Sequence, residues 1–204
     1  MPSPPQPPSA LQLDALREVA NIGCGNAASA LSRLVGGRRV NIEVPRAHVV
    51  DVDDLSALVG GHERQVVAAT LEIHGQLAGR VMVVLESGDA HRLCELLLNA
   101  PTEPRLREAE RSAFSEAANI VASACLSAIG QLTGLALVPS VPQVDEDDAA
   151  SVVEELLERS DPSVGVAVVL ETRFAATAAL PFEGQLLVVP HPASLKTLLQ
   201  RLGV

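Results

Sequence analysis

The chain has 204 residues, of which 48% are hydrophobic and only 1% aromatic, and its formal net charge is −10. This is enough apolar material for a core, which must be built mainly from Val, Leu, Ile and Ala. Without Trp or Tyr the chain has few rings on which bases could stack, and its negative charge disfavours phosphate backbones and anionic membranes. Composition therefore argues against a nucleic-acid-binding protein.

The N-terminal segment and the three cysteines bear on the cellular location. Residues 1–10 are rich in Pro, Ser and Gln and lack the basic region and apolar core of a signal peptide, so we expect a disordered tail. No apolar run reaches the roughly 20 residues that span a bilayer. Cys24, Cys94 and Cys125 lie in apolar surroundings, which is typical of reduced core thiols rather than of disulfides or a zinc site. These features predict a cytoplasmic protein without membrane insertion.

Hydrophobic periodicity predicts the elements of the first half of the chain. In order, they are a helix over 11–35, a strand over 40–44, strands over 66–73 and 79–85, and a helix over 89–98. Gly36-Gly37 should end the first helix, and Pro45 should close the first strand. Residues 49–61 are acidic, and Pro101–Pro104 is the natural joint to the second half.

The second half repeats this order. Its expected elements are a helix over 105–132, a strand over 135–141, an acidic amphipathic segment over 145–159, strands over 164–173, 175–180 and 185–189, and a helix over 193–202. The strands follow one another directly instead of alternating with helices, which indicates an α+β fold. We expect an antiparallel sheet of about six strands packed against the two long helices.

One short polar pattern occurs in both long helices. Each copy has a small oxygen-bearing residue, a Glu four positions later and an Asn three positions after that. The two copies are Asp14, Glu18 and Asn21, and Ser112, Glu116 and Asn119. At 100° per residue the three side chains fall within about 60° of arc, on the flank of the apolar stripe. Each copy should therefore form one exposed polar surface.

The similarity between the halves extends beyond this pattern. Ala20-Asn21-Ile22 matches Ala118-Asn119-Ile120, and Val44-Pro45 matches Val141-Pro142. A period near 100 residues is too long for a solenoid. The repeat instead predicts a single domain over 11–204, in which half-domains over about 11–100 and 105–204 pack around a pseudo-twofold axis.

A single Glu-x-x-Asn on a helix is most often an ordinary solvated face, because Glu is common at helix surfaces. Asn is less expected there, since it is a mediocre helix former. Two copies could also simply retain ancestral sequence. The pattern has survived, however, in two halves that have otherwise diverged, and this favours a working surface.

This arrangement, followed by a proline, resembles the signature of the CheC/FliY/CheX chemotaxis phosphatase family. Asn21 is followed by 23 residues and Pro45, and Asn119 by 22 residues and Pro142. The segments that look most like CheC-type members are 18–28 and 132–142. The resemblance covers the chain from about residue 11 to its end.

The resemblance implies a chemotaxis phosphatase that hydrolyses the aspartyl phosphate of a CheY-type response regulator. It implies that Glu18 and Glu116 dock to a lysine of the regulator, and that Asn21 and Asn119 orient the attacking water. The residues that would support the motif are Asp14, Ser112, Pro45 and Pro142. The chain would need no cofactor or metal of its own, because the regulator supplies Mg²⁺. Its five histidines are scattered without metal-ligand spacing, which agrees with that expectation.

The resemblance also suggests a second partner and an alternative function. In CheC proteins a helix in the second half contributes to docking of CheD, a receptor deamidase. The apolar face formed by Val152, Val153, Leu156 and Leu157 could serve that purpose, or it could simply cover the sheet. The alternative function is a non-catalytic adaptor that binds CheD or a regulator and controls its availability. Two motifs in one chain remove the need to dimerise, so we expect a monomer.

Overall fold

A computed structural model describes residues 9–176 and 182–202. Its elements are α1 (Ala10–Leu34), β1 (Val40–Asp51), α2 (Val52–Val59), a 3-10 turn (Gly61–Glu63), β2 (Gln65–Gly75), β3 (Gly79–Glu86), α3 (Ser87–Leu98), α4 (Glu108–Thr133), β4 (Leu137–Pro139), β5 (Gln143–Asp148), α5 (Ala149–Glu158), β6 (Val166–Ala176), β7 (Phe182–Pro190) and α6 (Pro192–Arg201). Most of the expected tail and most of the strand expected over 175–180 lie outside the described residues.

The strands form one antiparallel sheet in the order β1-β6-β7-β3-β2, with β4 and β5 both paired to the outer side of β2. The sheet is therefore six positions wide, as the sequence led us to expect, although two short strands share the last position and the sequence did not predict the second of them, β5. In the duplication β3 corresponds to β7, β2 to β6, and β1 to the pair β4 and β5. Corresponding strands lie at equal distances on either side of the boundary between β7 and β3, which places the pseudo-twofold axis there. Each edge strand pairs with a strand of the other half, so the halves share a single sheet.

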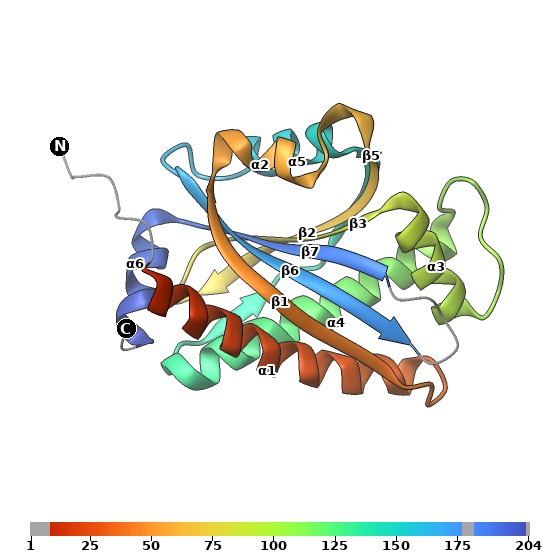
Figure 1. Ribbon diagram of the computed structural model, residues 1–204, viewed down its shortest axis with the longest axis horizontal. Coiled ribbons are helices and arrows are strands. Elements are labelled where there is room, and N and C mark those ends of the chain that lie inside the picture. Colours follow the sequence, from red (N-terminus) through yellow and green to blue (C-terminus); the bar gives the residue numbers. More distant parts are fainter. Residues whose placement is uncertain (1–8, 177–181, 203–204) are drawn as a thin grey trace.

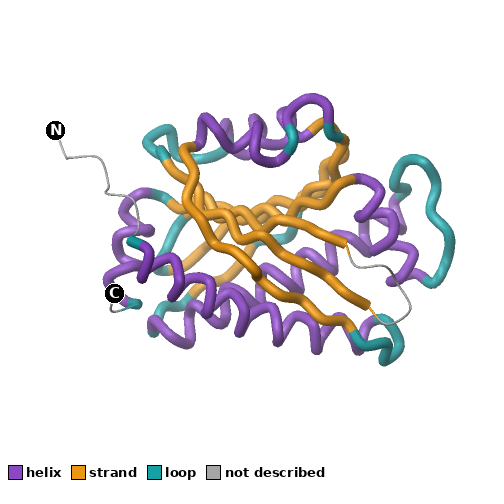
Figure 2. The backbone as a smooth tube through the Cα atoms, in the orientation of Figure 1, coloured by secondary structure: helices purple, strands orange, loops and turns teal. Residues whose placement is uncertain are grey.

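Helices cover both faces of this sheet (Figure 1). The long helices α1 and α4 pack side by side on one face, and the short helices α2 and α5 pack together on the other (Figure 2). Side chains alternate accordingly along β2. Val67, Ala69 and Leu71 belong to the core under α1 and α4, whereas Val66 and Ala68 belong to the core under α2 and α5. The predicted α+β class with two pseudo-symmetric halves is thus confirmed.

The two long helices match their predicted positions, but each apolar stripe ends earlier than expected. Gly134 ends α4 in the left-handed conformation, with φ of 72°, which costs glycine little. Leu34 and Leu132 continue the three- and four-residue spacing of the apolar stripes in the sequence, yet they are 47% and 55% exposed. Both lie in the last turn of their helices, where the residues that follow them, Val35 and Thr133, face the protein instead and are 7% and 5% exposed.

The predicted boundaries were wrong in three places. The first strand continues through Pro45 to Asp51, because the register shifts at a bulge and β1 is an edge strand that tolerates proline there. The acidic segment after it contains α2, whose first turn carries Asp53 and Asp54 next to the positive end of the helix dipole. Residues 143–148 form β5, an acidic edge strand, ahead of α5.

Helix α4 is the one described helix that is long and apolar enough to cross a membrane by length and composition. Its apolar residues have partners within the protein, since Phe114, Val121 and Leu126 lie in the core against the sheet. Packing in this fold therefore accounts for the hydropathy of α4.

A buried carboxylate holds the start of α4. Glu110 is 1% exposed, and its Oε2 accepts a hydrogen bond of 2.8 Å from the backbone N–H of Arg107, whose guanidinium lies 2.6 Å from Oε1. The Arg107 side chain lowers the pKa of Glu110 below its ordinary value. A lowered folded pKa stabilises the protein above the unfolded pKa, and the contribution is lost as the pH falls through the folded value.

We therefore expect Glu110→Gln to lower the free energy of unfolding at pH 7, and the deficit to shrink below about pH 4, near the unfolded pKa of Glu. Urea titrations of both proteins at pH 7 and pH 3 measure this difference. Glu108→Gln, an exposed change two residues earlier, is the control and should show a small deficit at both pH values. An equal Glu110→Gln deficit at the two pH values would contradict the ion-pair explanation.

Candidate functional site

The polar motif of each half lies on the solvent side of its long helix. Glu18 on α1 and Glu116 on α4 are exposed, and Asn21 and Asn119 are half-buried. Neither glutamate forms an ion pair with any described residue. Each half thus presents a carboxylate that is free to bind a cation, with an amide one turn further along the helix.

In the first half the Asn21 amide is bound to the backbone of β1. Its Oδ1 accepts a hydrogen bond of 2.8 Å from the Val44 N–H, and its Nδ2 donates one of 3.4 Å to the Val44 carbonyl. Val44 lies at the β1 bulge, between the register pairs of Glu43 and Arg46, so β6 does not satisfy these backbone groups. Asn21 replaces the missing strand partner, and both functional ends of its amide are occupied.

In the second half the corresponding amide is held differently. Asn119 Oδ1 accepts a hydrogen bond of 3.3 Å from the hydroxyl of Ser123, one turn further along α4. Its Nδ2 has no hydrogen-bond partner in the part of the chain that the structure describes. The repeat places Gly25 at the position of Ser123, so α1 has no side chain that could hold Asn21 in this way. Sequence reasoning missed Ser123, although this difference between the aligned copies could have revealed it.

The segments before the two motif prolines also differ. Val44, before Pro45, is 2% exposed, whereas its counterpart Val141, before Pro142, is 83% exposed. The second segment is tied to β2 instead, because the Ser140 N–H donates to the Glu72 carbonyl at 2.9 Å and the Ser140 hydroxyl accepts from the Glu72 N–H at 2.9 Å. Asn119 is therefore free of the backbone contact that occupies Asn21.

The residues four positions before the glutamates have unequal surroundings as well. The Asp14 carboxylate pairs with Arg17 at 2.6 Å, and both side chains are exposed. Ser112 is exposed, and the neighbouring Arg111 donates to the Val144 carbonyl, which joins α4 to β5. The first copy thus carries an additional acid and base, Asp14 and Arg17, beside its glutamate, whereas the second copy has the uncharged Ser112 in place of Asp14.

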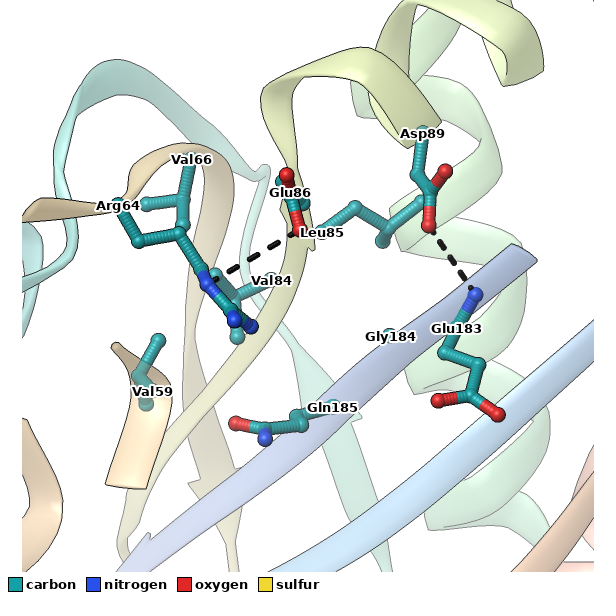
Figure 3. A pocket seen from close by; sticks show the side chains of 10 residues that line it. All are labelled: Val59, Arg64, Val66, Val84, Leu85, Glu86, Asp89, Glu183, Gly184 and Gln185. Carbon is teal, nitrogen blue, oxygen red and sulfur yellow. Dashed lines mark hydrogen bonds and ion pairs between the residues drawn. The ribbon is translucent and has the colours of Figure 1, made fainter. Parts of the chain in front are cut away.

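The motif residues form an open surface rather than a pocket. Of the five clearest pockets on the described residues, none is lined by a residue of either motif. Figure 3 shows one of them, where Arg64 faces Glu86 at 3.9 Å and Asp89 accepts from the Glu183 N–H at 3.2 Å. Of its apolar lining, Val59, Val66 and Val84 belong to the core under α2 and α5, and Leu85 belongs to the core under α1 and α4. A flat, exposed motif suits a macromolecular substrate better than a small one.

The apolar face predicted on α5 lies inside the protein. Val152, Val153 and Leu156 are at most 3% exposed and belong to the core shared with α2 and the sheet, and Leu157 packs against its edge. These four side chains have the sheet-covering role that the sequence had left as the alternative. A partner that approaches α5 in this conformation would meet its outer residues instead, among them Glu154 and Glu158.

Clusters of metal-binding side chains and the thiols are the other chemically active groups that could form a site. Among the described residues, no three His, Cys, Asp or Glu side chains are grouped so that they could hold a metal ion. All three thiols are buried and unpaired by disulfides. The motif surfaces therefore remain the candidate site.

Comparison with known proteins identifies a family model that covers the first motif and a relative that matches most of the chain. The family model described as the CheC-like family matches residues 11–49, which include the first motif and Pro45. The chain is 32% identical to the CheY-P phosphatase CheC of Bacillus subtilis over 94% of both chains.

Solved structures agree in fold. FliY of Thermotoga maritima superposes with a TM-score of 0.79 and 19% identity, over 96% of this chain and 98% of that one. The FliM middle domain of H. pylori superposes with a TM-score of 0.68 and 12% identity, over 95% and 99% of the two chains. With this fold, a duplicated motif and a relative that matches nearly the whole length, the chain belongs to the CheC-like family.

Proposed function

We propose that this protein hydrolyses the aspartyl phosphate of a CheY-type response regulator in chemotaxis signalling. The observation that carries the proposal is the pair of exposed Glu116 and half-buried Asn119 on α4, whose carboxylate and amide N–H₂ have no partner among the described residues. The B. subtilis relative named a CheY-P phosphatase supports the same substrate class.

Hydrolysis of an aspartyl phosphate requires the protein mainly to position the attacking water. An acyl phosphate is already activated, so water can attack phosphorus while the aspartate carboxylate leaves, giving inorganic phosphate and the free side chain. An uncharged amide can both donate to and accept from that water, and it adds no negative charge beside the phosphoryl oxygens. In this proposal Asn119 is the catalytic amide, Ser123 is the positioning residue that holds it, and the Mg²⁺ is the regulator's.

The glutamates would supply docking rather than catalysis. A carboxylate one turn away from the amide can pair with a lysine of the regulator without facing the phosphoryl group. The same spacing exists on α1, where Glu18 is also exposed. Because the Asn21 amide is already bonded to the backbone of Val44, it is less available than Asn119 to bind the attacking water. We therefore assign most of the turnover to the motif on α4.

We expect Glu116→Gln to raise the KM for the phosphorylated regulator about five- to tenfold while kcat changes little, because it removes one interfacial ion pair. The variant should also lose much of the salt dependence of binding. Glu154→Gln makes the same chemical change on the exposed side of α5 and is the matched control. A fall in kcat at unchanged KM would assign Glu116 to the chemical step instead.

The proposal is tested by the loss of radiolabelled phosphate from a purified CheY-type regulator, with and without the protein. We expect the protein to accelerate the loss, and a variant carrying both Asn21→Ala and Asn119→Ala to bind the regulator without accelerating it. Binding without acceleration by the natural sequence would support the adaptor function, in which the same surface sequesters the regulator.

We further propose that the protein acts as a cytoplasmic monomer and that CheD is a second partner. Two motif surfaces in one chain support the monomer, since neither surface needs a second copy to complete it. A CheD contact would use the exposed acidic ridge of α2 and α5, which includes Asp53, Asp54 and Glu154, because the apolar face of α5 is buried. Charge reversal on this ridge should weaken CheD binding and leave phosphatase activity unchanged.

A further inference from the structure

A cysteine from each motif helix lies where α1 crosses α4. The Sγ atoms of Cys24 and Cys125 are 3.9 Å apart, and both side chains are fully or almost fully buried. The helices touch here because the residue before Cys24 is glycine: a methyl group on Gly23 would lie 2.6 Å from the Cα of Cys125. The third thiol, Cys94, lies elsewhere and donates to the Glu110 carbonyl at 3.4 Å.

This separation is close to what a covalent bond needs. A disulfide has its sulfur atoms about 2.0 Å apart, so the two atoms must approach by about 2 Å. Side-chain rotation and a small shift of the helices can supply this movement, because the backbones are already in contact at Gly23. A thiol facing another thiol in an apolar core otherwise gains only a weak hydrogen bond.

The surroundings also favour reaction at this pair over Cys94. Cys125 borders a cavity of about 40 Å³ between α1, α4, α6 and the sheet, and a space of that size holds a water-sized molecule. The hydrogen bond between the two thiols lowers the pKa of Cys24 and raises the pKa of Cys125, which makes Cys24 the first to form a thiolate. Burial and nearby carboxylates raise the pKa of Cys94 to about 12, which keeps it protonated.

We propose that Cys24 and Cys125 form a redox modification site, in which a hydroperoxide converts the two thiols into a disulfide between the motif helices. The Cys24 thiolate attacks the O–O bond of hydrogen peroxide, becomes a sulfenic acid and releases hydroxide. The Cys125 sulfur then attacks the Cys24 sulfur, the S–S bond forms and the sulfenic oxygen leaves as water. The hydroxide takes up the proton originally on Cys24. Two thiols and one peroxide thus give one disulfide and two waters.

The disulfide would connect the two motif helices, α1 and α4, close to both motifs. Cys24 is three residues after Asn21, and Cys125 is six residues after Asn119. It would join positions 101 residues apart in the chain, and such a long closed loop restricts the unfolded state strongly. The oxidised protein should therefore unfold at a higher urea concentration than the reduced protein.

The test treats the purified full-length chain with hydrogen peroxide, removes the peroxide and counts thiols after unfolding. We expect one of the three thiols to remain, non-reducing peptide mapping to link Cys24 to Cys125, and dithiothreitol to restore all three. Cys94→Ala should lose both of its remaining thiols, whereas Cys24→Ala and Cys125→Ala should each keep two.

Three titratable thiols after treatment, a bridge to Cys94, or bridges only between separate chains would overturn the proposal. The mapping of the natural sequence decides the matter even if a cysteine variant folds poorly. An unchanged urea midpoint after complete bridging would refute the predicted stabilisation.

Discussion

Asn119→Ala is expected to remove most of the phosphatase activity at little cost in stability, whereas Asn21→Ala is expected to do the reverse. Removing one well-placed hydrogen-bonding group from an active site costs about 100- to 1,000-fold in rate, so the residual activity of Asn119→Ala should come from the α1 surface. Among the described residues the Asn119 side chain hydrogen-bonds only with Ser123, and its loss should change the unfolding free energy by about 0.5 kcal/mol or less.

The Asn21 substitution has a different physical consequence. It leaves the N–H and carbonyl of Val44, a residue that is only 2% exposed, without a partner, which should lower the unfolding free energy by about 1–3 kcal/mol. Activity corrected for the folded fraction should stay above about half of the natural value, because turnover is assigned to α4.

Urea titrations and single-turnover dephosphorylation of the same three proteins measure both effects. Ser123→Ala offers a further check, since it frees the Asn119 amide without removing it and should lower kcat by less than Asn119→Ala does. Equal losses of activity in the two Asn variants, with no difference in stability, would show that the backbone contact of Asn21 opens readily and that the two surfaces work alike.

The sequence predicted where the two motifs lie on their helices, but not the different hydrogen bonds of Asn21 and Asn119. The helices and the exposed side of each motif follow from local periodicity, because residues three and four apart share a helix face. The one-residue difference in the spacing to Pro45 and to Pro142 indicated that the two sites could differ in shape, but the bond from Asn21 to Val44 depends on a bulge 23 residues away. Only the three-dimensional register shows that one strand runs through its proline while the other breaks into β4 and β5.

The sequence also could not predict what covers the apolar face of α5. Periodicity identified its apolar face correctly, including Val152 and Leu156, but a pattern cannot state which surface covers that face. In the structure α2 and the sheet cover it. Because α2 was itself hidden in a segment that looked merely acidic, the helix that packs against α5 could not be foreseen.

Gly23→Ala is expected to destabilise the protein, although alanine is the better helix former. The crossing of α1 and α4 leaves no room for a methyl group, which would lie 2.6 Å from the Cα and 2.9 Å from the backbone N of Cys125. These are backbone atoms, so relief requires the two helices to move apart. Overpacking of this kind costs about 1–3 kcal/mol, which outweighs the gain of about 0.5–1 kcal/mol from replacing a helical glycine.

Gly25 provides the matched control, because it lies two residues further along the same helix and, apart from its own helical neighbours, no described atom lies within 4 Å of the position of an added methyl group. Gly25→Ala should therefore raise the unfolding free energy by about 0.5–1 kcal/mol, so the two substitutions should differ in sign. Urea denaturation at neutral pH under reducing conditions, with the pair of thiols intact, measures both. If Gly23→Ala were as stable as Gly25→Ala, the helices could separate at no cost, and their close crossing would not fix the relative placement of the two motif surfaces. Destabilisation by Gly23→Ala alone would show that one glycine determines how closely the two halves of the duplicated fold pack.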